Sequence, residues 1–372
     1  MKNRLLIAVI LISFFFVGWG SVGHRIINRN FILSNHPELN FLSFWADSLA
    51  AHGSDADNRK SIDPTEENKH YIDIDNYPNF LSTRRIIQDW DSVIAVYGQA
   101  FVMDQGILPW AILASVDSLT RQFQRKDWQK AMLTAADIGH YVGDGHMPLH
   151  ITRNYNGQYT GQSGVHSRYE STMIGRYSNE IIYTGDSCQY IDDLPNFVFG
   201  FLYSNYNYVD SVLLYDIQAK NEAGGSYNNI YYLQYWQKSK NFTIMLFRNT
   251  SNILARIIYT AWVNAGKPTM TTSVEKDDLA RKGLSLNVYP NPFTTNLNIR
   301  YSLPQKYEGK IKIELFDITG KELSKIYEGE PSAPDNEITF TPKDRSITTG
   351  VYILRYSAGN TSISKKILYL KQ

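Results

Sequence analysis

The residues in this chain best suited to chemistry are histidines and carboxylates at metal-ligand spacing. His140 and Asp144 are four positions apart in a segment with helical periodicity, so both side chains point from one helix face. His166 and Glu170 repeat this spacing, and His150 lies just beyond the end of the first of these helices. Imidazole and carboxylate groups without thiolates are typical of zinc sites that keep a coordination position open for hydrolysis.

Two further groups of residues extend this set toward the N-terminus. Asp55 and His70 are separated by a polar loop and add a carboxylate and an imidazole. His24 follows Trp19 by five positions. A free α-amino group on Trp19, its own carbonyl oxygen and the nearby imidazole can chelate one metal ion, but only after the upstream peptide has been removed.

Residues 1–18 are typical of a secretory signal peptide. Two basic residues precede the apolar run Leu5–Val17, which is too short to span a bilayer comfortably. Cleavage after Gly20 fits the preference for small residues but removes Trp19. We expect cleavage after Gly18, because only this cut leaves the amine of Trp19 free.

Composition excludes several other classes of protein. The 372 residues include 37 basic and 36 acidic ones, so the net charge of +1 provides no global attraction to nucleic acid or anionic membranes. Cys188 is the only cysteine, which excludes an intrachain disulfide. The chain is long enough for more than one domain.

The periodicity of the chain changes near residue 268. Residues 19–268 are mainly helical in pattern, most clearly in Trp128–Val142 and Phe242–Val263, where apolar residues recur every three or four positions. The polar run 269–284 predicts a linker. We therefore expect a mainly α catalytic domain followed by a separate small domain at 285–372.

The segment 285–372 alternates apolar and polar residues and predicts an all-β sandwich. It contains no histidine and no group of residues that suggests catalysis. It resembles the C-terminal sorting domain of the type IX secretion system of Bacteroidetes, through Tyr289–Phe293, Leu315–Lys321, Gly350–Tyr352 and a final strand that ends in lysine. The resemblance implies contact with that secretion machinery and a secreted or surface-attached protein.

The first domain also resembles a known family. The motifs that carry the resemblance are Trp19-Gly20-x-x-Gly23-His24, His70-Tyr71-Ile72-Asp73, His140-Tyr141-Val142-Gly143-Asp144 with Pro148-Leu149-His150, and His166 with Glu170. They are similar to those of the three-zinc nucleases of fungi and plants, the nuclease S-one/P-one family. The bacterial zinc-dependent phospholipases C, distant relatives of these nucleases, share the ligand order. The resemblance covers roughly residues 19–267.

This resemblance implies three zinc ions per chain. The first ion would be held by Asp55, His70, His140 and Asp144. The second would be held by the Trp19 amine and carbonyl, His24 and a bridging oxygen of Asp144. The third would be held by His150, His166 and Glu170.

The sequence departs from the nucleases at two of these positions. The nucleases usually have Asp where this chain has Glu170, and the surrounding residues are closer to the phospholipase form. Asp47 lies in a short local sequence that matches the nucleases, but it precedes His70 by 23 residues. Asp55 has the family spacing and is our expectation for the upstream ligand, with Asp57 as the alternative.

The resemblance also implies roles in catalysis and substrate binding. Asp144 would bridge the close pair of ions, and Asp55 would orient the attacking water. Tyr71 and Asp73 occupy the positions of a base-binding pocket, in which an aromatic ring stacks on the base and a carboxylate accepts a hydrogen bond from it. Arg59 or Lys60 could add a cationic contact to phosphate. His36, His52 and His146 have no assigned role.

We therefore expect a secreted zinc endonuclease that hydrolyses single-stranded DNA and RNA to 5′-phosphate products, with 3′-nucleotidase activity as a further expectation. The alternative enzyme is a zinc-dependent phospholipase C. A second alternative is a surface zinc-binding protein without turnover, which a phosphodiesterase assay would distinguish. Apart from the secretion machinery that 285–372 contacts, we expect no stable protein partner.

Overall fold

The computed structural model describes residues 20–269 and 284–371, apart from 304–306, 308, 318–319, 332, 334, 343–346 and 360. The predicted signal peptide, Trp19 and nearly all of the predicted linker lie outside the described residues. The chain divides into two compact units, Met1–Met270 and Thr271–Gln372. Each unit has its own hydrophobic core.

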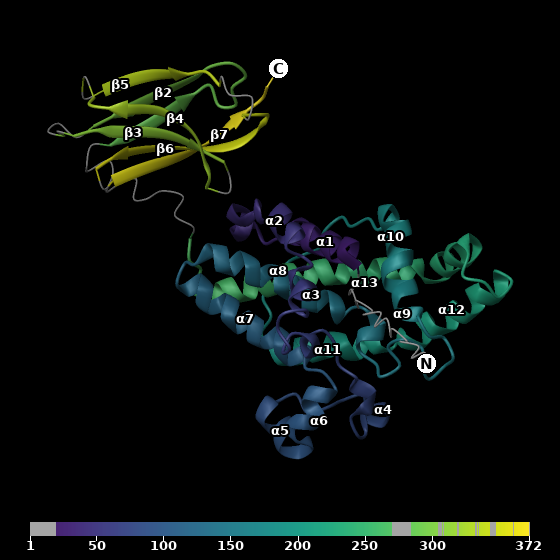
Figure 1. Ribbon diagram of the computed structural model, residues 1–372. Coiled ribbons are helices and arrows are strands. Elements are labelled where there is room, and N and C mark those ends of the chain that lie inside the picture. Colours follow the sequence, from purple (N-terminus) through teal and green to yellow (C-terminus); the bar gives the residue numbers. More distant parts are fainter. Residues whose placement is uncertain are drawn as a thin grey trace, which may run out of the picture. The chain divides into compact units, whose positions relative to one another are not determined.

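The first unit is helical, which confirms the expected fold class (Figure 1). Its helices are α1 Gly20–Asn30, α2 Trp45–Ala51, α3 Asp55–Arg59, α4 Phe80–Thr83, α5 Trp90–Tyr97, α6 Gln99–Asp104, α7 Leu108–Gln124, α8 Trp128–Asp144, α9 Val165–Ser167, α10 Ile174–Tyr177, α11 Leu194–Tyr206, α12 Val209–Glu222 and α13 Asn229–Asn264. The short helical turns are η1 Phe31–Ser34, η2 Pro37–Leu42, η3 Glu67–Lys69, η4 Ile74–Asn76, η5 Pro148–His150, η6 Arg168–Met173 and η7 Ser178–Glu180.

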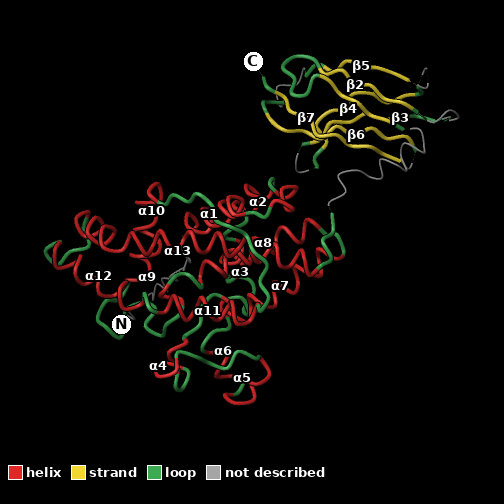
Figure 2. Tube along the Cα trace, turned by 180° about the vertical axis from the view of Figure 1, so that it is seen from behind, coloured by secondary structure: helices red, strands yellow, loops and turns green. Residues whose placement is uncertain are grey.

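Helix α8 lies in the middle of this unit, packed against α7, α13 and α1 (Figures 1 and 2). Asp127 caps its N-terminus by accepting a hydrogen bond from the backbone N–H of Lys130. Every residue from Ile138 to Asp144 is buried, so the C-terminal half of the helix has no solvent-exposed face. The fold therefore delivers His140 and Asp144 into the interior.

A glycine on α8 allows α1 to approach closely. A Cβ on Gly139 would lie 1.9 Å from the Oδ1 of Asn28, a buried residue of α1. The Nδ2 of Asn28 donates to the carbonyl oxygens of Leu49 and Ala136, at 3.0 and 3.1 Å. This contact holds α1, which carries His24, against the helix that carries Asp144.

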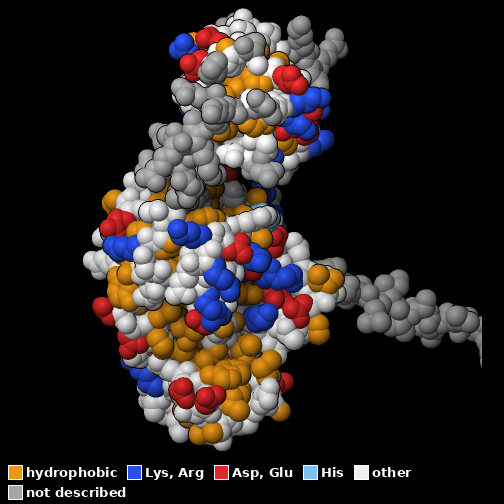
Figure 3. All heavy atoms as spheres, turned by 90° about the vertical axis from the view of Figure 1, so that its left-hand side faces the viewer, with side chains coloured by type: hydrophobic (Ala, Val, Ile, Leu, Met, Phe, Trp, Pro, Cys, Tyr) orange, Lys and Arg blue, Asp and Glu red, His pale blue; other side chains and the backbone are white. Residues whose placement is uncertain are grey.

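The surface of the helical unit is mixed in charge. Figure 3 shows Lys and Arg side chains intermingled with Asp and Glu on the face that it presents, and hydrophobic side chains gathered toward one end of the unit. The small helices α4 and α5 carry the exposed Leu81 and Val96. None of the helices in the described part of the chain combines the length and apolar character that a membrane span requires.

The second unit consists of two antiparallel sheets that share one core (Figure 2). Its strands are β1 Ser285–Tyr289, β2 Leu297–Ser302, β3 Ile311–Phe316, β4 Glu322–Gly329, β5 Asp335–Phe340, β6 Gly350–Ala358 and β7 Thr361–Tyr369. The strand orders are β1-β2-β5 and β4-β3-β6-β7. Strand β2 buries Leu297, Ile299 and Tyr301, as its alternation predicts.

Strand β6 corrects one detail of the sequence pattern. An alternation predicted from Val351 and Ile353 identifies the wrong face, because these two side chains are only half-buried. Tyr352, Leu354 and Tyr356 face the core instead. Apolar residues occupy both faces of this strand, so period-two alternation alone cannot distinguish its two sides.

Candidate metal centre

The first cluster of candidate ligands surrounds the carboxylate of Asp144. Its Oδ2 lies 2.9 Å from the Nδ1 of His70 and 3.4 Å from the Nε2 of His140. Its Oδ1 lies 3.6 Å from the Nε2 of His24 and 3.9 Å from the Nδ1 of His150. The two oxygens of one carboxylate thus face different imidazoles, as a bridging ligand requires.

Asp57 completes this cluster from α3. Its Oδ1 lies 3.6 Å from both the Nδ1 of His70 and the Nε2 of His140, and it also pairs with the Nζ of Lys60 at 2.7 Å. His24 and His140 stack with ring centroids 3.7 Å apart. Ligand atoms of His24, Asp57 and His140, and of His70, His140 and Asp144, lie close enough together to hold a metal ion.

His150, His166 and Glu170 form a separate group. The carboxylate of Glu170 lies 3.3 Å from the Nε2 of His150 and 2.8 Å from the Nε2 of His166. Glu170 lies on the π-helical turn η6, a distortion that is frequent at functional sites. The three ligand atoms again lie close enough together to hold one ion.

A buried ion pair anchors the π-helical turn on its other side. Arg168 lies between His166 and Glu170 in sequence, and its Nε donates to Asp216 of α12 at 3.1 Å. Its two remaining nitrogens donate to the backbone oxygens of Ser163 and Gln162, at 2.8 and 3.0 Å. These bonds fix the segment that presents the third ligand group.

Backbone carbonyls determine which ring nitrogen most of the histidines offer. The Nδ1 of His140 lies 2.8 Å from the oxygen of Gly53, and that of His150 lies 2.7 Å from the oxygen of His70. The Nδ1 of His166 lies 3.1 Å from the oxygen of Tyr155. A carbonyl accepts only from a protonated nitrogen, so in all three rings the Nε2 is left as the ligand atom.

The electrostatics of the first cluster favour a bound cation. Burial raises the pKa of the Asp144 carboxyl, but His140, His150 and His70 outweigh burial and hold this pKa below its ordinary value. Burial lowers the pKa of His140, yet Asp144 and Asp57 raise it to about 9. Burial lowers the pKa of His24 to about 3, so this ring is neutral. Ionised carboxylates therefore hold protons on neighbouring imidazoles, which a metal ion would displace.

Several buried polar atoms of the candidate ligands also favour a bound metal ion. In the described part of the chain, the Nε2 of His24, the Oδ1 of Asp144, the Nε2 of His150 and both oxygens of Glu170 are buried and lack a hydrogen-bond partner. A buried polar group that makes no hydrogen bond costs about 1–3 kcal/mol. Coordination to metal ions would satisfy these atoms together, so the residues present fit the metals that the sequence implies.

The upstream acid in this cluster is Asp57, and our expectation of Asp55 is corrected. The carboxylate of Asp55 points away and lies 2.6 Å from the Nδ1 of His52, with both side chains about 40% exposed. The two acids are two residues apart in α3, which places their side chains about 200° apart around the helix axis. Only one of them can face α8. Asp47 pairs with Arg29 at the surface.

Arg59 has a different environment from the one expected. Its guanidinium donates to Glu66 and Asp137, both at 3.1 Å, and does not line the cavity beside the metal ligands. Lys60, the alternative cation, does line that cavity. The placement therefore favours Lys60 over Arg59 as a contact for a phosphate group.

A cavity of about 200 Å³ opens beside the ligands. It is lined by Lys60, Glu67, His70, Tyr71, Asp73, Leu149, His150, Tyr155 and His166. Tyr71 and Asp73 thus line the same cavity as the candidate metal ligands His70, His150 and His166. Burial, with Asp75 and Asp104 nearby, raises the pKa of Asp73 to about 7.

Sequence reasoning missed Glu67 and Tyr155 in this cavity. Glu67 precedes His70 by three residues, and Tyr155 belongs to the loop rich in Asn, Gly and Tyr that precedes His166. Neither position carries a ligand-like spacing. Their roles follow from packing, because the loop folds back so that the Tyr155 carbonyl meets His166.

Comparisons with known proteins cover the tail and the whole fold. A family model described as a secretion system C-terminal sorting domain matches residues 287–370. Two solved structures are similar to the chain over most of its length. Clostridium perfringens alpha-toxin from the avian strain SWCP has 14% identity and a TM-score of 0.45, over 95% of this chain and 98% of that chain. Alpha toxin from Clostridium absonum has 9% identity and a TM-score of 0.43, over the same shares. No curated protein matches the chain.

The sorting domain establishes where the protein acts. It indicates passage across the outer membrane, followed by release or attachment at the cell surface, and it implies contact with the type IX secretion machinery. The expected localisation is therefore confirmed.

Proposed function

We propose that this protein is a secreted zinc-dependent phosphodiesterase. The observation that carries the proposal is the carboxylate of Asp144, whose two oxygens face separate sets of imidazoles, with His150, His166 and Glu170 close by. Bound zinc supplies Lewis acidity and lowers the pKa of coordinated water toward neutrality, which phosphodiester hydrolysis requires. The ligand chemistry, nitrogen and carboxylate oxygen without sulfur, suits zinc in such sites.

The proposed ligand sets follow the geometry. Asp57, His70, His140 and Asp144 would hold one ion, and His150, His166 and Glu170 would hold another. His24 and the second oxygen of Asp144 would hold the remaining ion together with the amine of Trp19. Trp19 lies outside the described residues, but a Cβ on the next residue, Gly20, would lie 3.6 Å from the Cα of Ser171, the neighbour of Glu170. This position supports a mature N-terminus beside the ligands.

We further propose that the substrate is single-stranded nucleic acid, cleaved endonucleolytically to 5′-phosphate products. The cavity beside His150 and His166 contains Tyr71 and Tyr155, whose rings suit stacking with a splayed base. Stacking of this kind is worth about 1–3 kcal/mol per base. Asp73 lies in the same cavity and could exchange a hydrogen bond with a base edge. Lys60 supplies a cation for the phosphate.

The same cavity supports one other candidate substrate. Aromatic rings beside Asp73 and Glu67 would also attract a quaternary ammonium group, through cation–π contact and charge. A choline phospholipid carries such a group next to its phosphodiester bond. A zinc-dependent phospholipase C is therefore the second candidate.

Turnover by the zinc-loaded mature protein separates these candidates. The substrates would be single-stranded DNA, RNA, duplex DNA and phosphatidylcholine in mixed micelles. We expect at least a severalfold preference for single strands over duplex, because a recessed cavity admits a flexible strand more easily. Faster hydrolysis of phosphatidylcholine would support the phospholipase instead. Zinc binding without turnover on any substrate would identify a zinc-binding protein.

A pair of tyrosine variants tests the base pocket. Tyr71→Ala should raise KM for single-stranded DNA about tenfold, since the loss of one stacked base costs about 1–3 kcal/mol. Tyr190→Ala is the matched control, because Tyr190 is exposed, bonds to Asn264 and does not line the cavity. Equal KM values for the two variants would contradict the pocket.

A further inference from the structure

His70 differs from the three carbonyl-bonded histidines in the way its ring is turned. His140, His150 and His166 each direct Nδ1 at a backbone carbonyl and leave Nε2 toward the candidate metal. His70 instead directs Nδ1 at Asp144, at 2.9 Å. Its Nε2 is buried, has no hydrogen-bond partner among the described residues, and lies 3.6 Å from the Oε1 of Glu66. The group behind this ligand is therefore a carboxylate and not a carbonyl.

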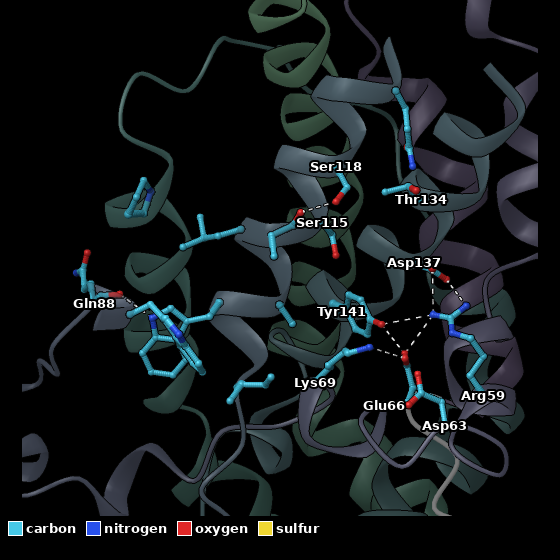
Figure 4. Close-up of a pocket in the computed structure, with 18 of the residues that line it drawn as sticks. Arg59, Asp63, Glu66, Lys69, Gln88, Ser115, Ser118, Thr134, Asp137 and Tyr141 are labelled. Carbon is cyan, nitrogen blue, oxygen red and sulfur yellow. Dashed lines mark hydrogen bonds and ion pairs between the residues drawn. The ribbon is translucent and has the colours of Figure 1, made fainter. Parts of the chain in front are cut away.

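Glu66 is held in place by several donors. Its side chain is 1% exposed. Figure 4 shows the Nζ of Lys69 and the guanidinium of Arg59 directed at its carboxylate, at 2.8 and 3.1 Å, and Tyr141 donating to it through its hydroxyl. Two cationic side chains and one hydroxyl therefore surround the carboxylate of Glu66. The carboxylate is thus charged and unable to turn freely.

These donors line a second cavity, distinct from the one that His70 lines. Arg59, Glu66, Lys69, Asp137 and Tyr141 all line a cavity of about 1050 Å³, whereas His70 lines the cavity of about 200 Å³. Arg59 also donates to Asp137, at 3.1 Å, and to the hydroxyl of Tyr141, at 3.4 Å. The carboxylate of Glu66 therefore links this network to His70, and the ring of Tyr141 also packs edge-on against His70, with ring centroids 5.5 Å apart.

We propose that Glu66 is a positioning residue for the metal ligand His70, holding the proton on Nε2 so that the lone pair of Nδ1 faces the metal. The inference rests on the proposed zinc centre. A carboxylate behind a ligating imidazole fixes its tautomer and orientation and raises its basicity. A separation of 3.6 Å is outside hydrogen-bond range but allows a strong interaction with a buried charge. Arg59 and Lys69 act on His70 through Glu66.

The test compares Glu66→Gln with Asp137→Asn in the full mature protein. Both changes replace a carboxylate of the same network by an amide of the same shape, but only Glu66 touches His70. The probe is zinc alone, bound in competition with a chromophoric chelator, so that no substrate is needed. We expect Glu66→Gln to weaken the affinity for at least one zinc equivalent by 10-fold to 100-fold. Asp137→Asn should stay within about threefold of the wild type, and Glu66→Asp, which keeps the charge, should recover most of the loss.

An imidazole measurement makes the proposal independent of how well the variants fold. Nitrogen-15 spectra of the zinc-loaded wild type should show the Nε2 of His70 protonated and its Nδ1 bound to metal. The opposite tautomer would overturn the proposal, as would equal zinc affinities for Glu66→Gln and Asp137→Asn. Weakened zinc binding by Glu66→Gln in a protein that hydrolyses no phosphodiester would refute the proposed function but support the role of Glu66. A wild type that binds no zinc would refute both.

Discussion

Gly139→Ala tests whether the contact between α1 and α8 holds the metal centre together. The added methyl group would lie 1.9 Å from the Oδ1 of Asn28 and 2.8 Å from the Cδ2 of Leu254. Both neighbours are buried, so neither can move into solvent. The amide of Asn28 must shift by more than 1 Å, roughly the difference between 1.9 Å and an ordinary contact of ~3.5 Å.

The magnitude follows from the bonds that this shift breaks. Asn28 donates to the backbone oxygens of Leu49 and Ala136, and each buried oxygen left without its donor costs about 1–3 kcal/mol. Overpacking of a core adds about 1–3 kcal/mol. Because alanine has a higher helix propensity than glycine, about 1 kcal/mol of this loss in stability is offset. With at least one bond broken, the net loss in free energy of unfolding is about 3 kcal/mol.

Gly200→Ala is the matched control, because Gly200 lies within α11 and a Cβ there would meet none of the described residues within 4 Å. It should raise the free energy of unfolding by up to about 1 kcal/mol. The assay is denaturant unfolding followed by the helical circular dichroism signal, with the metal removed by a chelator. Zinc content should also fall in Gly139→Ala, since α1 carries His24. Equal stability of the two variants would refute the reasoning.

Three further predictions concern the ligands, the pocket and the tail. Asp144→Asn should remove more zinc and turnover than His166→Ala, because the two oxygens of Asp144 face different imidazoles; retention of most of the zinc would contradict the bridging role. In the metal-free protein above pH 7, Asp73→Asn should raise the free energy of unfolding by about 1–2 kcal/mol. The pKa of Asp73 is raised from 3.8 to about 7, which means that its ionised form destabilises the fold, and partial exposure reduces this destabilisation to the value given. The unfolded chain ionises near pH 4 and the folded chain near pH 7, so the wild type loses stability across this interval and the variant's advantage should vanish toward pH 4; an advantage independent of pH would count against the raised pKa. Removal of 285–372 should abolish export but leave turnover per zinc unchanged, because this segment contains no histidine; an inactive but folded catalytic domain would argue against this.

A fifth prediction concerns the free amine of Trp19 as a metal ligand. A protein that retains Met before Trp19 should bind one zinc fewer than the processed protein, because an extended amine is no longer free to chelate. Zinc content measured per chain checks this, with N-terminal sequencing to establish that processing leaves Trp19 first. A mature N-terminus at Ser21 would contradict the proposed chelate.

The sequence by itself was sufficient for what depends on local spacing. The four-residue intervals from His140 to Asp144 and from His166 to Glu170 place each pair on one helix face whatever the surrounding fold. The change from helical to alternating periodicity near residue 268 predicted a mainly α unit followed by a β unit. The tail motifs similarly predicted the sorting domain that matches 287–370.

Only the tertiary structure decided which of several equivalent residues turns inward. Asp55 and Asp57 share one short helix, and the packing of α3 against α8 directs Asp57 to the metal ligands while Asp55 meets His52. Arg59 likewise pairs with Asp137, which is 78 residues away in sequence. Periodicity states which residues share a face, but the direction of that face depends on contacts between distant segments. The role of Glu66, four residues before His70, could not be predicted from the sequence for the same reason. It depends on the fold, which brings Tyr141 and Arg59 to the carboxylate of Glu66.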